Sequence, residues 1–91
     1  MSFKNCMLLF NEIYNSYISN NIKFDINKIT FEVPGEQKYM CQTIFKWGNN
    51  KVQFPSEKYN DKQSAENDCF LKYVIYMHKN GYIDDNFRIK M

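Results

Sequence analysis

The chain has 91 residues, which suffices for one compact domain and leaves no room for a second hydrophobic core. Hydrophobic residues make up 44% and aromatic residues 18% of the sequence, which is too apolar for a disordered chain. The formal net charge is only +2, which excludes a protein that binds polyanions through bulk charge but allows a local basic patch.

The cysteines and the apolar runs indicate the cellular compartment. Cys6, Cys41 and Cys69 are odd in number, far apart and set among apolar residues, so we interpret them as buried thiols of a reducing compartment. No apolar run approaches the roughly 18 residues of a membrane span, and the N-terminus lacks the regions of a signal peptide. The sequence therefore predicts a cytoplasmic protein that does not enter a membrane.

The first predicted element is an amphipathic helix over about residues 3–19. Its apolar residues recur at spacings of three and four, which places them on one face of a helix. Ser2 is available as the N-cap, and Asn20-Asn21 as a polar stop. The predicted apolar stripe consists of Phe3, Cys6, Met7, Phe10, Ile13, Tyr14 and Tyr17.

An extended region follows this helix. Residues 20–27 are predicted as a connector, whose apolar residues Ile22, Phe24 and Ile26 alternate with polar ones and could form a short extended piece packed against the core. Residues 28–33 predict a first strand, because β-branched and aromatic residues dominate there. Pro34 and Gly35 then predict a turn.

A hairpin is predicted next. Residues 38–47 form the longest strand candidate, and residues 51–54 form the third strand, which Pro55 stops. The turn between them is Gly48-Asn49-Asn50, because Gly and Asn tolerate a positive φ. The residues predicted to share one face of the longer strand are Tyr39, Cys41, Thr43, Phe45 and Trp47.

A second helix is predicted after a polar loop, with Asn60 or Asp61 as its N-cap and Gly81 as the left-handed residue that closes it. Two small residues, Ala65 and Cys69, would let this helix lie close to the sheet. Its predicted buried stripe consists of Ala65, Cys69, Phe70, Tyr73, Val74 and Met77.

Together these elements predict an α+β fold of order α-β-β-β-α, in which two helices pack on one face of a three-stranded antiparallel sheet. A single domain is expected over residues 1–91, with its core at about residues 3–80. The tail over residues 82–91 is apolar enough to pack back on the domain or to meet a partner. Its apolar residues are Tyr82, Ile83, Phe87 and Ile89.

No pattern in the chain indicates catalysis or metal binding. The sequence holds no phosphate-cradling glycine loop, no nucleophile elbow and no zinc motif. His78 has no cysteine or carboxylate at metal-ligand spacing, and Asp84-Asp85 is expected to be a solvated pair. We therefore expect a binding protein that is not an enzyme and needs no cofactor or metal.

The order of the elements and their local motifs resemble the double-stranded RNA-binding domain over about residues 5–80. Asn11 and Glu12 follow an apolar pair, like the Asn/Gln-Glu pair in the first helix of that family. The segment VPGEQKY is similar to the first hairpin loop of the family, with Pro and Gly in reversed order and without the His. The segment DKQSAENDCF is similar to the Lys-Lys-x-Ala-Lys opening of its second helix.

The second-helix motif departs from the family at two positions. Gln63 replaces the second lysine and Glu66 the third, and the Gly-x-Gly that precedes the motif is missing. Glu66 would lie one turn into the helix and repel phosphates, unless Lys62 pairs with it at i,i+4.

The resemblance implies sequence-independent binding of double-stranded RNA across two minor grooves and the phosphates between them, a span of about 16 base pairs. The first helix would meet one minor groove, the turn from Pro34 to Lys38 the next, and the start of the second helix the phosphates. The implied RNA-binding residues are Asn11, Glu12, Gln37, Lys38, Lys58, Lys62 and Gln63.

Other interpretations of these residues stay open. Glu12 could be a solvated helix residue, and Lys38 a plain surface lysine. Gln63, Glu66 and the modest net charge favour an alternative: a degenerate domain of the same fold that dimerises or binds a protein partner and no longer contacts RNA.

The chain is rich in Lys, Asn, Ile, Tyr and Phe, which share A+T-rich codons, as in the genomes of many viruses and protists. Together with the resemblance, this bias suggests a viral binder that hides RNA duplexes from host sensing or RNA silencing in the host cytoplasm.

Overall fold

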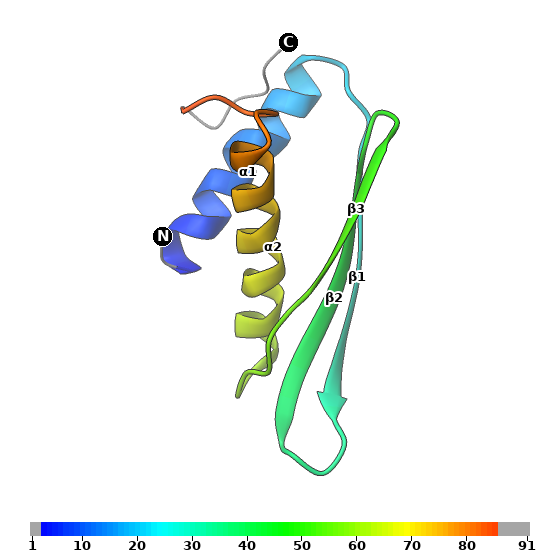
Figure 1. Ribbon diagram of the computed structural model, residues 1–91, viewed down its shortest axis with the longest axis vertical. Coiled ribbons are helices and arrows are strands. Elements are labelled where there is room, and N and C mark those ends of the chain that lie inside the picture. The colour runs from blue at the N-terminus through cyan, green and yellow to red at the C-terminus, as the bar shows by residue number, and fades with distance from the viewer. Residues whose placement is uncertain (1–2, 86–91) are drawn as a thin grey trace.

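The computed structural model describes the backbone of residues 3–85 and the side chains from Leu8 to Asp85. The predicted order of helix, three antiparallel strands and helix is confirmed (Figure 1). Both helices lie on the same side of the sheet and pack against each other; α2 lies along β2, and α1 reaches β1 through Phe10 and Tyr17. The elements are α1 (Phe3–Ser19), β1 (Phe24–Val33), β2 (Lys38–Trp47), β3 (Asn50–Pro55) and α2 (Lys62–Lys79).

Strand β1 begins earlier than the sequence predicts. Residues 24–27, predicted as part of a connector, pair with the end of β2, so that Phe24 lies opposite Trp47 and Ile26 opposite Phe45. The reason is that the alternation of apolar and polar residues in this segment already has the period of a strand. In the second half of β1 the apolar residues no longer all lie on the buried face, and Ile29 is exposed on the outer face of the sheet.

Strand β2 is the middle strand of the sheet and carries its buried face. Cys41, Thr43, Phe45 and Trp47 are buried as predicted, and Tyr39 is partly buried on the same face. A two-residue turn at Gly48 and Asn49 leads into β3, with Gly48 at a positive φ of 58°. The hydrogen-bonded pairs of β2 therefore hold the sheet together from its centre.

The predicted stripe of α1 is correct at three described positions and wrong at one. Phe10, Ile13 and Tyr17 are buried, whereas Tyr14 is 40% exposed. Tyr14 lies one residue after Ile13, which turns it about 100° away from the buried line of the helix. The side chains of Phe3, Cys6 and Met7 lie outside the described residues.

Helix α2 starts and ends where its sequence predicts. Asp61 is the N-cap, and its carboxylate accepts a hydrogen bond of 2.8 Å from the backbone N–H of Ser64. Gly81 has a φ of 75°, and the next N–H, of Tyr82, donates to the carbonyl oxygen of Met77 at 2.9 Å. All six residues of the predicted stripe are buried: Ala65, Cys69, Phe70, Tyr73, Val74 and Met77.

The start of the tail packs back on the domain, which is one of the two alternatives that the sequence left open. Ile83 is only 1% exposed, and the ring of Tyr82 lies edge-on to Trp47 at 5.7 Å. Phe87 and Ile89 lie outside the described residues. Cys41 and Cys69 are buried free thiols, while the side chain of Cys6 is not among those described. No helix in the described part of the chain is long and apolar enough to cross a membrane.

Candidate nucleic-acid interface

The turn between β1 and β2 lies beside the segment that leads into α2. The backbone N–H of Tyr39 donates to the carbonyl oxygen of Tyr59 at 2.7 Å, and the N–H of Tyr59 donates back at 2.9 Å. Both segments lie at the lower end of the molecule in Figure 1. Residues 34–38 and 58–63, which are far apart in the sequence, therefore form one surface, called here the turn–helix surface.

Three lysines predicted to bind RNA make contacts within the turn–helix surface. The ammonium group of Lys58 donates to both carboxylate oxygens of Glu36, at 2.7 and 2.9 Å. Lys38 donates to the side-chain oxygen of Asn60. The ammonium group of Lys62 lies 5.8 Å from the centre of the Tyr39 ring, in a cation–π contact. The two segments thus bring the three cations close together.

Two carboxylates moderate the positive charge of this surface. Glu36 pairs with Lys58, and Asp61 lies at the N-cap of α2. Three ammonium groups against these two carboxylates leave an excess of one positive charge. The first turn of α2 also presents backbone N–H groups that have no partner inside the helix and form the positive end of its dipole. The surface suits a weakly bound anion that approaches the start of α2.

The two predicted glutamines of the surface are exposed. Gln37 closes the turn in a left-handed conformation, with a φ of 52°. Gln63 lies in the first turn of α2. The amide group of each side chain can both donate and accept hydrogen bonds, which suits contact with hydroxyl groups.

Glu66 does not pair with Lys62. Its carboxylate instead lies 3.3 Å from the ammonium group of Lys28 and accepts a hydrogen bond of 3.1 Å from the hydroxyl of Thr30. Both partners come from β1, because this side of α2 faces the sheet. The acid that replaces the third lysine of the family motif is therefore directed toward the sheet and is balanced by a cation there.

Asn11 and Glu12 are exposed on α1, between the buried residues Phe10 and Ile13. Among the described side chains, no hydrogen bond or ion pair joins Asn11 or Glu12 to the turn–helix surface, which is formed by other elements. In Figure 1, α2 lies between α1 and the sheet that carries the turn, so α1, α2 and the turn follow one another across this view. The structure thus brings five of the predicted residues together and places these two on a neighbouring helix.

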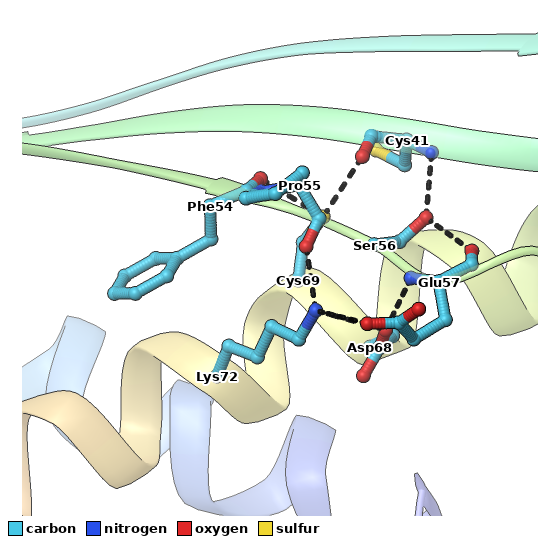
Figure 2. A network of polar contacts seen from close by, with 8 residues as sticks. All are labelled: Cys41, Phe54, Pro55, Ser56, Glu57, Asp68, Cys69 and Lys72. Carbon is cyan, nitrogen blue, oxygen red and sulfur yellow. Dashed lines mark hydrogen bonds and ion pairs between the residues drawn. The ribbon is translucent and has the colours of Figure 1, made fainter.

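A polar network fixes the loop before α2 (Figure 2), and the sequence patterns did not predict it. Ser56 is buried and accepts a 2.7 Å hydrogen bond from the N–H of Cys41, whose carbonyl oxygen accepts from the N–H of Ser56. The carboxylate of Asp68, only 6% exposed, accepts from the N–H of Glu57 at 2.8 Å. This network holds the chain just before Lys58, so it positions the turn–helix surface.

Lys72 completes the network from the next turn of α2. Its ammonium group donates to the carbonyl oxygen of Pro55 at 2.7 Å and lies 3.5 Å from the carboxylate of Asp68. The i,i+4 spacing of Asp68 and Lys72, beside the predicted stripe residues Ala65 and Cys69, is the sequence signal that could have indicated this pair.

The Cys69 thiol is a poor nucleophile. Burial raises its pKa to about 12, and its sulfur lies 3.4 Å from the carbonyl oxygens of Cys41 and Phe54, either of which can accept its hydrogen. Within the described residues, no three metal-ligating side chains gather in one place.

Comparison of the chain with models of protein families, with curated proteins and with solved structures gave no match. The chemistry of the described side chains is therefore the basis for proposing a function.

Proposed function

We propose that this protein binds double-stranded RNA through its backbone and shape, without reading sequence and without catalysis. The observation that supports the proposal is the gathering of Lys38, Lys58 and Lys62 beside the N-terminus of α2. A-form RNA exposes phosphates across a groove too narrow for side chains to enter, and 2′-hydroxyls in a shallow minor groove. Cations at a helix start match the phosphates, and exposed amides match the hydroxyls.

In this proposal each element meets a different part of the duplex. The start of α2, with Lys58, Lys62 and Gln63, lies against the phosphates. The turn, with Gln37 and Lys38, reaches one minor groove, and α1, with Asn11 and Glu12, reaches the other. The proposed role in a cell is to cover duplexes in the cytoplasm, hiding them from host sensors or from Dicer-type cleavage if the protein is viral.

The proposal is tested by a salt titration with a duplex of about 20 base pairs. The affinity should fall with salt with a log–log slope of about −2 to −3, as expected when Lys38, Lys58 and Lys62 each neutralise one phosphate. The double variant Lys58→Ala/Lys62→Ala should lose most of the binding and about two units of this slope, measured by fluorescence anisotropy. Affinity that does not change with salt, or no binding at low salt, would contradict the proposal.

Lys46 and Lys51 provide the matched control. They are exposed and lie opposite each other on the outer face of the β2–β3 pair, away from the helices. Lys46→Ala/Lys51→Ala removes the same charge and should leave binding within about twofold. Equal losses in both double variants would show that only net charge matters, and would overturn the assignment of the turn–helix surface.

A third variant in the same titration changes the charge in the other direction. Glu36→Gln removes the carboxylate that holds Lys58 and keeps the size of the side chain. Because Lys58 then no longer has to leave an ion pair to reach a phosphate, the affinity should rise several-fold and the salt slope should steepen. An unchanged affinity would mean that Lys58 does not contact RNA.

One observation favours the alternative function, a module that binds protein and not RNA. The Lys58–Glu36 pair already satisfies the most central cation of the surface. Circular dichroism shows whether Lys58→Ala/Lys62→Ala is folded. If it is, and if neither this variant nor the native protein binds the duplex, the protein-binding alternative replaces RNA binding.

A further inference from the structure

Strand β1 is an outer strand of the sheet, and its free edge can be deduced from the hydrogen bonds of β2. In an antiparallel sheet the N–H and C=O of one residue point to the same side, and the side alternates along the strand. Tyr39 and Cys41 bond to Tyr59 and Ser56, which lie on the β3 side. The residues of β2 between and after them, such as Met40 and Gln42, therefore bond toward β1.

The residues of β1 that face the free edge follow from the register. Phe31 lies opposite Met40 and Ile29 opposite Gln42, so these two residues use their backbone groups inside the sheet. The backbone N–H and C=O groups of Lys28, Thr30 and Glu32 point outward. No other strand among the described residues pairs with this edge. A ten-residue strand with an open edge is a template for another strand.

The side chains along this edge divide by face. Ile29 and Phe31, on the outer face of the sheet, are 68% and 38% exposed. Lys28 and Glu32 lie on the face of the helices, and Lys28 pairs with Glu66. Within the described part of the chain, no cation lies at ion-pair distance from Glu32. The edge therefore carries two exposed apolar side chains, one cation and one exposed carboxylate, of Glu32, that has no ion pair within the described part of the chain.

We propose that the edge of β1 binds a second copy of this chain, as an antiparallel strand related by a two-fold axis at Thr30. In this register Thr30 lies opposite Thr30 of the second copy, Lys28 opposite its Glu32, and Ile29 opposite its Phe31. Every one of these pairs occurs in both directions because the axis is two-fold. Cross-strand pairs of opposite charge and of aromatic with β-branched residues are the pairs that stabilise sheets.

The charges select this register over its neighbours. An axis at Lys28 would place two ammonium groups opposite each other, and an axis at Glu32 would do the same with two carboxylates. Like charges directly opposite each other destabilise a strand pair. An inward charge on an edge usually prevents strand addition. Axes at Ile29 or Phe31 would leave both charges without an opposite partner, so only the axis at Thr30 places Lys28 opposite Glu32 of the other copy. This alignment uses the β1 edge of both copies, so assembly through this edge stops at a dimer.

The dimer surface is separate from the turn–helix surface. Gln37 belongs to the turn, Lys58 to the segment before α2 and Lys62 to the start of α2, so none of them lies on β1. The inference therefore does not depend on RNA binding, and the two can fail independently. Because only a few residue pairs meet, the contact area is small and the dissociation constant should lie between micromolar and millimolar.

The test uses two variants that each reverse one charge. Glu32→Lys places a second cation opposite Lys28 of the other copy, and Lys28→Glu places a second acid opposite Glu32. Each variant alone should therefore be monomeric. In an equimolar mixture both charge pairs are restored, so a heterodimer should form. Sedimentation velocity at about 0.5 mM protein, within the range set by such weak contacts, measures the three samples and the native chain.

The control is Glu57→Lys, which makes the same change of charge at an exposed position on the loop before α2. It should leave the dimer intact. Far-UV circular dichroism checks that every variant is folded, because Lys28→Glu also faces Glu66. If Lys28→Glu does not fold, Thr30→Pro takes its place. It removes an outward N–H at the axis and should give a monomer.

Three results would overturn the inference. They are a monomeric native chain at this concentration, a Glu32→Lys variant that dimerises as well as the native chain, and a mixture of folded Glu32→Lys and Lys28→Glu that stays monomeric. Loss of RNA binding with the dimer unchanged would overturn the proposed function alone.

Discussion

Among single residues, Asp68 fixes the backbone on which the candidate interface is built. Its carboxylate is buried and joins the N–H of Glu57 to the ammonium group of Lys72. A buried charge is tolerated only when it is paired and hydrogen-bonded, and both conditions are met here. Since Glu57 directly precedes Lys58, this carboxylate fixes the backbone that carries the central cation of the turn–helix surface.

Asp68→Ala should therefore destabilise the protein by about 2–3 kcal/mol, because it leaves the part-buried N–H of Glu57 without its acceptor and removes the buried one of the two carboxylates beside Lys72. Glu57→Ala removes an exposed carboxylate 3.6 Å from the same lysine and should cost under about 1 kcal/mol. Urea denaturation measures both values. Equal losses would show that Asp68 acts only through its charge near Lys72 and not as a buried acceptor.

At the scale of elements, the closeness of α2 to β2 depends on small side chains. Ala65 and Cys69 are fully buried and meet Cys41 of β2, with Tyr59 packed against this group. Because Tyr59 also forms the backbone bridge to Tyr39, the same contact holds the loop against the hairpin. The packing of one helix turn thus determines where the two halves of the turn–helix surface meet.

Ala65→Leu should force α2 away from the sheet and cost about 1–3 kcal/mol, the usual penalty for overfilling a packed core. Gln63→Leu introduces the same leucine two residues earlier at an exposed position, where it overfills nothing, so the stability should stay within about 0.5 kcal/mol of the native protein. Thermal and urea unfolding of both variants provide the measurement. A tolerated leucine at position 65 would mean that the contact with Cys41 is loose.

Local sequence patterns predicted the elements well, but they did not predict the contacts between them. The bounds of α1 and β2 and the cap at Asp61 follow from periodicity and turn residues, which act over a few neighbours. Lys58 and Glu36 are 22 residues apart, and their pairing depends on the strand bridge that aligns the two segments. No spacing rule covers such a pair, and the same holds for Glu66, which turns to Lys28 on β1 rather than to Lys62 one turn away.

At the scale of the whole molecule, two tyrosines join the helices to the sheet. The hydroxyls of Tyr17 on α1 and Tyr73 on α2 lie 2.6 Å apart, and both residues are fully buried. The ring of Tyr17 stacks on Phe24 of β1 at 4.8 Å, and that of Tyr73 on Phe45 of β2 at 4.1 Å. Through these four rings, both helices and the sheet meet at one hydrogen-bonded centre.

Because of this tyrosine pair, the stability of the protein should fall at alkaline pH. Burial raises the pKa of Tyr17 and of Tyr73 above the value of about 10 for an unfolded chain. A group with a raised pKa in the folded state stabilises fully below its unfolded pKa and loses that contribution as the pH rises toward the folded value. The free energy of unfolding should therefore be steady at neutral pH and fall above about pH 10.

Each buried tyrosine contributes up to about 1.4 kcal/mol per pH unit to this fall, and Cys69 adds to it from about pH 9. Tyr17→Phe should cost about 1 kcal/mol at pH 7, because the Tyr73 hydroxyl loses its partner, and it should make the alkaline decline shallower. Tyr14→Phe, at an exposed tyrosine of the same helix, should change neither quantity. Urea denaturation at half-unit steps from pH 8 to about 11.5 resolves these slopes. If Tyr17→Phe declined as steeply as the native chain, the alkaline decline would not come from the Tyr17–Tyr73 pair, and the role of this pair as a titrating centre would be wrong.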